Sequence, residues 1–248
     1  MSSDERALES GLGDPAIAPA IARGRLEILG LLPDSSNYTF LARAIGPDGQ
    51  EALAVYKPRR GEIPLWDFPE GTLCRREVAA YVVARELGWP HVPPTILRDG
   101  PEGIGSVQTF VRFQPEEHYF TLADRFADEF GRVAVFDLVI NNADRKGGHT
   151  LLGEDGLIWA IDHGVCFSPE PKLRTVIWEH MDEPIPPTLL DDLHRFATSL
   201  ASDGAGHELG SLLAEEELAA VASRIEGILA DPRFPAPSGS RPFPWPPV

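Results

Sequence analysis

A strongly polar loop lies between two apolar runs in the middle of the chain. It is part of VINNADRKGGHTLL, residues 139–152, and is followed by LIWAIDHGVCF, residues 157–167. The apolar flanks indicate that both ends of the loop are anchored in a core, where charged and imidazole groups would need partners. We therefore expect the loop itself to lie outside the core, pinned between buried elements. Catalytic groups are commonly held on such loops.

The composition narrows the classes of protein that the chain can belong to. Its 248 residues, of which 43% are hydrophobic, suffice for one large core or two modest lobes. No apolar run is long enough to cross a bilayer and the start of the chain is acidic, so we expect a cytoplasmic protein without stable membrane insertion. The two cysteines, Cys74 and Cys166, match no metal or redox spacing. A net charge of −16 argues against nucleic acid as a partner.

The first part of the chain has the alternation and the turn residues of a β-rich lobe. Strands are expected over residues 25–33, 38–45, 51–58 and 105–113. A helix is expected between the last two strands, over residues 72–87, and Gly88 with Pro90 should end it.

Helical patterns dominate after residue 113. Thr121 and Asp124 resemble a capping box for a single helix that runs on through Val139. After the polar loop we expect a short hairpin, and then two more helices, near residues 187–200 and 214–229.

These patterns predict an α+β fold that forms one domain with two lobes. A β-rich lobe over residues 24–113 should adjoin a mainly helical lobe over residues 114–230, an arrangement suited to holding a nucleotide in a cleft. Residues 1–23 are expected to be a flexible arm, and the proline-rich residues 231–248 a tail that is extended or disordered at its end.

Two carboxylates mark the candidate site. Asp144 and Asp162 stand at the ends of elements that the short hairpin must bring close together, and paired acids beside a cleft can bind Mg²⁺ or orient a nucleophile. Taken alone, each has a simpler explanation, because Asn142-Ala143-Asp144 can stop a helix and Asp162-His163-Gly164 can be an ordinary turn.

Cations and a turn complete the set that phosphoryl transfer requires. Lys57 closes a strand in the other lobe and can meet phosphate oxygens, and Glu77 on the helix can hold that lysine in place. Lys146 can neutralise charge on a transferring phosphoryl group. The turn at residues 34–37 offers backbone N–H groups and the side chains of Ser35, Ser36 and Asn37 to phosphates.

The order of these segments resembles one family. They are AVYKPRRGE at residues 54–62, GIGSVQTFV at 103–111, FDLVINNADRKGGHTLL at 136–152 and WAIDHGVCFSP at 159–169. Together they look like the phosphatidylinositol 3-/4-kinase superfamily. The resemblance is greatest to type II phosphatidylinositol 4-kinases and their bacterial relatives, with a more distant likeness to HipA-type protein kinases. It covers residues 53–169 and implies a two-lobed protein-kinase-like fold that uses ATP with Mg²⁺ or Mn²⁺.

The resemblance also implies roles for individual residues. Lys57 matches the lysine that binds the nucleotide phosphates, with Glu77 as its helix partner. Asp144 matches the catalytic-loop aspartate, and Lys146 resembles the loop lysine of protein kinases. Asp162 matches the metal-binding aspartate. The strand at 107–111 matches the hinge whose backbone meets adenine, which gives Gln108, Phe110 and Val111 as nucleotide contacts.

One position departs from the family pattern. The catalytic loop usually carries an asparagine as a further metal ligand, and this chain has His149 there. His149 is therefore a candidate ligand for a softer divalent metal, and ordinary two-metal chemistry is in doubt.

The sequence thus predicts an ATP-dependent kinase-like phosphotransferase that acts on a hydroxyl group. We find no palmitoylation cluster and no basic amphipathic helix, which favours a soluble protein or small polyol over bilayer lipid as the acceptor. Two other functions stay open. The chain can be a nucleotide-binding pseudokinase that regulates a partner, or it can transfer the nucleotidyl group from the same site.

Overall fold

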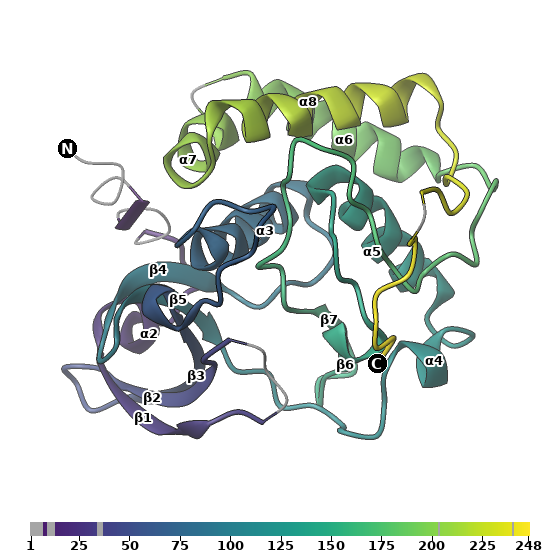
Figure 1. The fold of residues 1–248 in the computed structure, drawn as a ribbon. Helices are drawn as coiled ribbons and strands as arrows, with labels where there is room; N and C mark the ends of the chain where they lie inside the picture. The colour runs from purple at the N-terminus through teal and green to yellow at the C-terminus, as the bar shows by residue number, and fades with distance from the viewer. Residues whose placement is uncertain (1–6, 9–12, 34–36, 203, 240) are drawn as a thin grey trace.

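Five antiparallel strands form the sheet of the first lobe, in the order β1-β2-β3-β5-β4. They are β1 (Arg25–Leu31), β2 (Phe40–Ile45), β3 (Glu51–Pro58), β4 (Thr95–Gly100) and β5 (Gly103–Thr109). Alternate side chains of β2 and β3, from Ala42 to Tyr56, are buried, so one face of the sheet belongs to the core. The computed structural model describes residues 7, 8, 13–33, 37–202, 204–239 and 241–248. The sheet lies to one side of the helices (Figure 1).

The expectation of a loose arm before residue 24 needs correction for the part that the structure describes. Helix α2 (Pro19–Arg23) packs on the sheet through Ala20 and Ile21, both buried. Asp14 accepts hydrogen bonds from the Tyr81 hydroxyl at 2.7 Å and from Arg85 Nη1 at 3.2 Å. Apolar burial and these two bonds together tie residues 13–23 to the domain.

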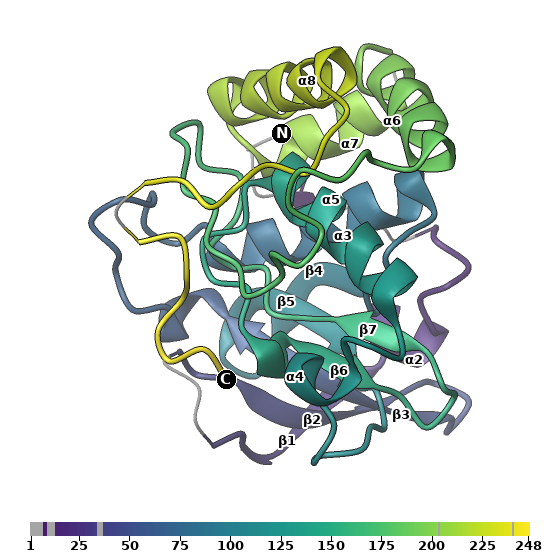
Figure 2. The same cartoon turned by 90° about the vertical axis from the view of Figure 1, so that its right-hand side faces the viewer.

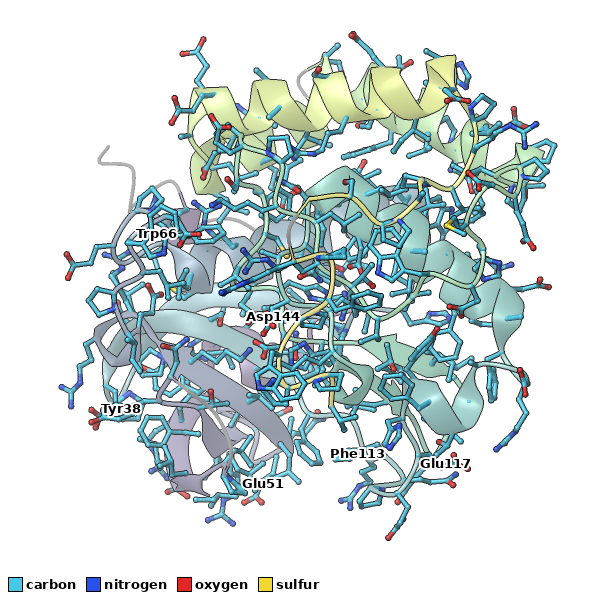
Figure 3. All side chains as sticks on the ribbon, turned by 45° about the vertical axis from the view of Figure 1, so that its right-hand side comes forward. Tyr38, Glu51, Trp66, Phe113, Glu117 and Asp144 are labelled. Atoms are coloured by element: carbon cyan, nitrogen blue, oxygen red, sulfur yellow. The ribbon has the colours of Figure 1, made fainter. Side chains whose placement is uncertain are left out.

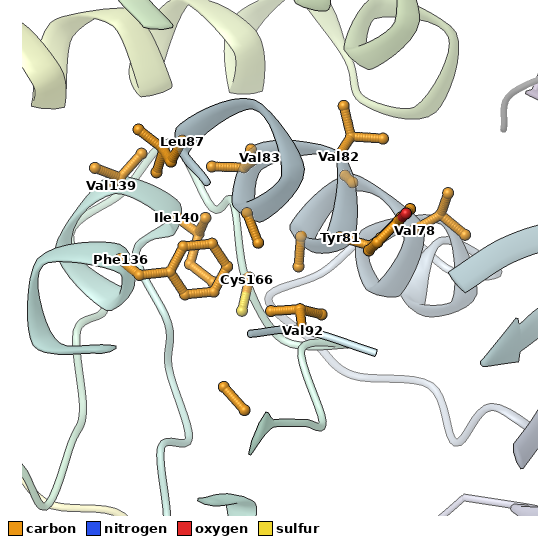
Figure 4. Close-up of a cluster of buried hydrophobic side chains, with 14 of the residues drawn as sticks. Val78, Tyr81, Val82, Val83, Leu87, Val92, Phe136, Val139, Ile140 and Cys166 are labelled. Carbon is orange, nitrogen blue, oxygen red and sulfur yellow. The ribbon is translucent and has the colours of Figure 1, made fainter. Parts of the chain in front are cut away.

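Helix α3 (Leu73–Leu87) follows the short 3-10 turn η1 (Arg59–Gly61) and crosses behind the sheet. It ends as expected at Gly88, which takes the left-handed conformation (φ 82°) that glycine adopts without steric cost. Val82, Val83 and Leu87 lie in the cluster of buried side chains to which Phe136 and Val139 also belong (Figure 4). This packing joins the two lobes through their helices.

The single helix expected from Thr121 onward is two helices, α4 (Tyr119–Leu122) and α5 (Ala127–Ile140). The predicted cap at Thr121 and Asp124 is wrong. Instead Thr121 is the third residue of α4, and its hydroxyl accepts a hydrogen bond from the His118 N–H at 3.0 Å. The break at Phe126 allows Tyr119 and Phe130 to meet edge to face, with ring centroids 5.1 Å apart.

Three further helices close the second lobe above α3 and α5 (Figures 1 and 2). They are α6 (Pro187–Leu200), α7 (Ala205–Leu212) and α8 (Glu215–Ala230). The expected hairpin is present as β6 (Thr150–Leu152) and β7 (Ile158–Ala160), after the 3-10 turn η2 (Gly147–His149). Among the residues that the structure describes, no helix combines the length and the apolarity needed to cross a bilayer.

The proline-rich tail folds back over the helical lobe. The N–H of Ile185 donates to the Pro232 carbonyl at 2.9 Å, and the tail then runs past α5 to end beside β6 and α4 (Figures 1 and 2). Of the two alternatives predicted for the end of the tail, extended or disordered, the described residues 241–248 adopt the extended one. Their hydrogen bonds to the candidate catalytic loop are taken up below.

Candidate active site

Lys57, at the end of β3, meets two carboxylates that come from distant parts of the chain. Its Nζ donates to Asp162 Oδ1 at 2.8 Å and also pairs with Glu77 Oε1 on α3. We call these three residues the lysine triad. Its members come from the sheet, from α3 and from the segment after β7, so the folded domain alone brings them together.

Glu77 is held in place from both sides. Its Oε2 accepts a hydrogen bond from the N–H of His163 at 3.0 Å. The preceding residue, Arg76, is buried and anchors α3 to the helical lobe, because it pairs with Glu217 of α8 and donates to the Cys166 carbonyl at 2.6 Å. The position of Glu77 is thus fixed by contacts that do not involve a nucleotide.

The charges of the lysine triad are unevenly placed. Lys57 lowers the pKa of Asp162 well below its usual range, and this attraction outweighs the effect of burial. Burial raises the pKa of Glu77, against the opposing effect of Lys57. The side chain of Asp162 is 47% exposed and that of Glu77 only 3%, so burial opposes the charged form more strongly at Glu77.

The polar loop begins where α5 ends at Asn141, a residue with positive φ (51°). The Asn142 side chain donates to Asp137 Oδ1 at 2.9 Å and accepts from the N–H of Asp144 at 2.9 Å. These two bonds fix the turn that presents Asp144.

Arg145 is the centre of the loop, and it is completely buried. Its guanidinium pairs with Asp137 through Nε and Nη2, each at 2.9 Å from a carboxylate oxygen. Nη1 donates to the carbonyls of His149 at 3.1 Å and Ile161 at 3.0 Å, and Nη2 donates to His163 Nε2 at 2.8 Å. One buried side chain thereby connects the loop with the segment that carries Asp162.

The burial of Arg145 and Asn142 corrects the expectation that this loop lies outside the core. Both charges of the Arg145–Asp137 pair are fully buried, and the pair is stable there because the remaining guanidinium donors also have acceptors. Sequence reasoning missed Asp137 and His163 as well. The available signal was Asp137 itself, an acid within the apolar run VFDLVI.

Asp144 faces Lys146, with Nζ 3.3 Å from Oδ2. Burial raises the pKa of Asp144, Lys146 opposes this, and the nearby charge of Asp162 raises it further. Asp144 lies near the centre of the molecule (Figure 3), and Lys146 links it towards Asp162, because the Lys146 N–H bonds to His149, whose Nε2 is 3.3 Å from Asp162 Oδ2. A carboxylate with a raised pKa is suited to accepting a proton.

Comparisons with known protein sequences indicate the family of this chain. The family model described as phosphatidylinositol 3- and 4-kinase matches residues 95–201. The chain is 40% identical to Protein Rv2133c of Mycobacterium tuberculosis, over 91% of this chain and 93% of that protein. It is 27% identical to phosphatidylinositol 4-kinase gamma 4 of Arabidopsis thaliana, over 54% of this chain but only 31% of the plant protein. The chain belongs to the phosphatidylinositol 3-/4-kinase-like superfamily.

The fold of this superfamily member is shared with solved kinase structures. The Helicobacter pylori proinflammatory kinase CtkA superposes with a TM-score of 0.55 over 85% of this chain and 93% of that chain, at 11% sequence identity. At an identity this low, the superposition shows a shared fold and no shared function. The predicted two-lobed protein-kinase-like architecture is therefore confirmed.

The expected hinge of this superfamily member lies at the end of β5. Gln108 is buried within the sheet, where it is paired with Val55 and Thr95, and its Nε2 donates to Thr95 Oγ1 at 2.9 Å. The N–H of Phe110 donates to the Leu53 carbonyl at 3.1 Å, so sheet bonding extends to this residue. Val111 follows the last of these bonds, and contact of the three residues with a nucleotide stays a prediction.

The predicted phosphate-binding turn is described only at its end. Ser35 and Ser36 lie outside the described residues. Asn37 accepts a hydrogen bond from the N–H of Ile63 through Oδ1 at 2.7 Å. Its side chain thus connects this turn to the segment after η1.

His149 lies against Asp162, the predicted metal ligand. Its Nε2 is 3.3 Å from Asp162 Oδ2, and its Nδ1 accepts from the N–H of Lys146 at 3.4 Å. Burial lowers the pKa of His149 to about 4, so the ring is neutral near pH 7. The bond at Nδ1 places the ring proton on Nε2, on the side of the ring that faces Asp162.

The residues of the site fit a divalent cation that also binds phosphates. Asp162 and Asp144 supply carboxylate oxygens, which Mg²⁺ and Mn²⁺ accept. Within the described residues no group of three or more acidic, His or Cys side chains surrounds one metal position. The remaining ligands would therefore come from nucleotide oxygens and water, as is usual for Mg²⁺ in phosphoryl-transfer sites.

Proposed function

We propose that this chain is an ATP-dependent phosphotransferase that moves the γ-phosphate to a hydroxyl group of a protein or a small polyol. The observation that supports it best is the lysine triad, in which Lys57 bonds to both Glu77 and Asp162, with Asp144 nearby. Phosphoryl transfer is catalysed mainly by positioning and charge, and this site supplies both.

Each residue has a defined part in the proposed reaction. Lys57 binds phosphate oxygens of ATP, and Glu77 keeps its ammonium group directed into the site. Asp144 orients the acceptor hydroxyl and accepts its proton as the oxygen attacks the γ-phosphorus. The new O–P bond forms as the bond from the γ-phosphorus to the bridging oxygen breaks, and ADP leaves with that electron pair. Lys146, beside Asp144, offsets charge on the transferring group.

Asp162, with His149, would hold Mg²⁺ or Mn²⁺. A bound cation would neutralise phosphate charge during transfer. The positions of the two acids do not depend on a bound cation. They are fixed by the hydrogen bonds through Asn142 and Arg145.

The surroundings of the site favour a polar acceptor over a membrane lipid. Lys172 is one of two cations near the site that could meet an anionic head group, but its Nζ is 2.8 Å from Asp67 Oδ2. The same ammonium lies 5.2 Å from the centre of the Trp66 ring. It is thus engaged in contacts within the protein.

The deciding experiment uses ATP labelled separately at the α and γ phosphates. Transfer of the γ label to an acceptor supports the proposal, and transfer of the α label supports nucleotidyl transfer instead. Beforehand, ATP with Mg²⁺ or Mn²⁺ at about 100 times its dissociation constant should stabilise the fold by about 2.7 kcal/mol. The absence of any thermal shift with either metal contradicts nucleotide binding and with it the whole proposal.

A second function, that of a nucleotide-binding pseudokinase, is favoured by one observation. His149 stands at the usual asparagine position, and its Nε2 lies 3.3 Å from Asp162 Oδ2, so the ring occupies space beside the carboxylate that a cation would need. Nucleotide binding without transfer of either label would support this function.

A further inference from the structure

Residues 241–248 of the tail cross the candidate catalytic loop. The N–H of Thr175 donates to the Pro242 carbonyl at 3.1 Å, and the N–H of Gly147 donates to the Pro247 carbonyl at 2.8 Å. Residues 174–176 in turn bond to the loop, because the N–H of Arg145 donates to the Arg174 carbonyl at 2.9 Å. The tail therefore spans from one side of the loop to the other, next to Asp144 and Lys146.

One residue of this segment is buried against the protein. Pro244 is buried, whereas the residues on either side of it, Phe243 and Trp245, are 54% and 88% exposed. Phe243 still meets Trp178 edge to face, with ring centroids 6.4 Å apart. The segment thus lies along the surface and is held by a buried proline, a ring contact and its two backbone bonds.

Gly147 lies between the Phe120 ring and the tail. A Cβ atom there would lie 2.9 Å from the Phe120 ring, which is too close, and 3.5 Å from the Pro247 carbonyl oxygen, which is an ordinary contact. The glycine thus lets the Phe120 ring pack against the loop beside the N–H that binds the tail. We call Phe120, Gly147, Thr175 and Trp178 the acceptor surface.

The acceptor surface recognises the main chain of its occupant. Its N–H groups bind carbonyl oxygens that are separated along an extended segment, and an aromatic ring packs beside them, as in the recognition of proline-rich peptides. Prolines also lower the entropy cost of ordering such a segment. Residues 241–248, RPFPWPPV, contain no Ser, Thr or Tyr, so this occupant has no hydroxyl to accept a phosphate.

We infer that the acceptor surface binds an extended polypeptide substrate, and that residues 241–248 occupy it in cis as a competitor that cannot react. The inference rests on the proposed phosphotransferase function and names its substrate class. When the segment lifts away, a polypeptide with a hydroxyl-bearing residue takes its place beside Asp144.

Binding is measured first, because it does not depend on turnover. The probe is a fluorescent RPFPWPPV peptide with blocked ends, followed by polarisation with the full chain. Pro244→Asp places a charge at the buried contact and should release the segment, and Pro246→Asp puts the same charge at an exposed position as the matched control. If the segment covers the surface in about 90% of molecules, its release should tighten peptide binding about tenfold.

Activity is measured second, as γ-phosphate transfer to a degenerate Ser/Thr/Tyr peptide mixture and, separately, to vesicles of phosphatidylinositol. Pro244→Asp should lower the KM for the peptide mixture about tenfold with ATP affinity unchanged, and free RPFPWPPV should compete with the mixture. Phe243→Ala, which removes only the ring contact with Trp178, provides a milder variant if Pro244→Asp fails to fold.

The outcomes separate the inference from the function on which it rests. No tighter peptide binding by either folded tail variant overturns the inference, whatever the activity. A gain confined to the lipid vesicles overturns the polypeptide class. Peptide binding that rises without any γ transfer overturns the proposed function and removes the substrate role, leaving only a peptide-binding surface.

Discussion

The two sides of the candidate site are built differently. On the nucleotide side, the lysine triad is held by ion pairs, and Arg76 and the N–H of His163 fix Glu77 in turn. On the acceptor side, Asp144 faces Lys146 at 3.3 Å, and the neighbouring Gly147 bonds to the tail. The nucleotide side is thus complete within the core of the domain, whereas the acceptor side is covered by a segment from the end of the chain.

This difference bears on how the protein is regulated. Helix α3, which carries Glu77, is bound to the helical lobe through Arg85, which pairs with Glu208 at 2.6 Å, and just beyond its end Trp89 donates to Asp192 at 2.7 Å. A large swing of α3 would break these contacts. Control of activity is therefore expected on the acceptor side, where the tail makes fewer contacts.

The largest effects are expected for replacement of Asp144 and Asp162, and the two variants should lose different properties. Asp144→Asn should lower kcat by about 10²–10⁴-fold, because it removes the group that accepts the proton, while nucleotide binding stays close to that of the wild type. Asp162→Asn should instead weaken binding of the metal–nucleotide complex, because a charged oxygen ligand is lost. Steady-state kinetics and ATP-dependent thermal shifts measure the two effects.

Equal loss of nucleotide binding in both folded variants would contradict the division of the site into two sides. Lys146→Met is a useful control on the acceptor side. It removes the ion-pair partner of Asp144 and should lower kcat without reducing ATP affinity.

The next effect concerns stability. Arg145→Met removes the buried partner of Asp137 and leaves a carboxylate uncompensated in the core, so the free energy of unfolding should fall by about 3–5 kcal/mol. Arg132→Met is the matched control on α5, because its 3.8 Å pair with Glu129 is exposed and the change should stay within about 0.5 kcal/mol. Urea denaturation measures both. Similar values for the two variants would show that Arg145 does not hold the loop.

Much of the fold could be predicted from local sequence. The strands β1 to β3 and the helices α3, α6 and α8 have clear alternation or helical periodicity, and Gly88 ends α3 as expected. Strand β4 was not predicted, because TILRDG has no apolar alternation and its order depends on pairing with β5. The break between α4 and α5 also depends on a tertiary contact, that of Tyr119 with Phe130.

In the candidate site, as in the fold, local sequence signals could be predicted and tertiary contacts could not. The order of Lys57, Glu77, Asp144 and Asp162 along the chain suggested that they meet, and the structure brings Lys57 to both Glu77 and Asp162. The buried network of Arg145 could not be read from the sequence, since a charged loop residue normally indicates exposure. The contact of the tail with Gly147 was equally hidden, because proline-rich segments are usually extended and solvated.

The smallest expected effect is at His149, where the two sides of the site meet. A neutral imidazole with Nε2 beside Asp162 can either bind the metal through Nε2, with its proton moved to Nδ1, or keep the proton on Nε2 and only pack beside the carboxylate. Nitrogen ligands suit Mn²⁺ better than Mg²⁺. If His149 is a ligand, the wild type should prefer Mn²⁺, and His149→Asn should shift the ratio of activities toward Mg²⁺ by about tenfold, the lower end of what altered metal surroundings produce. His149→Ala controls for packing, because it removes the ring without supplying an oxygen ligand. An unchanged metal ratio in His149→Asn would assign the histidine to holding Asp162 in place, and would leave the roles of the two acids as they are.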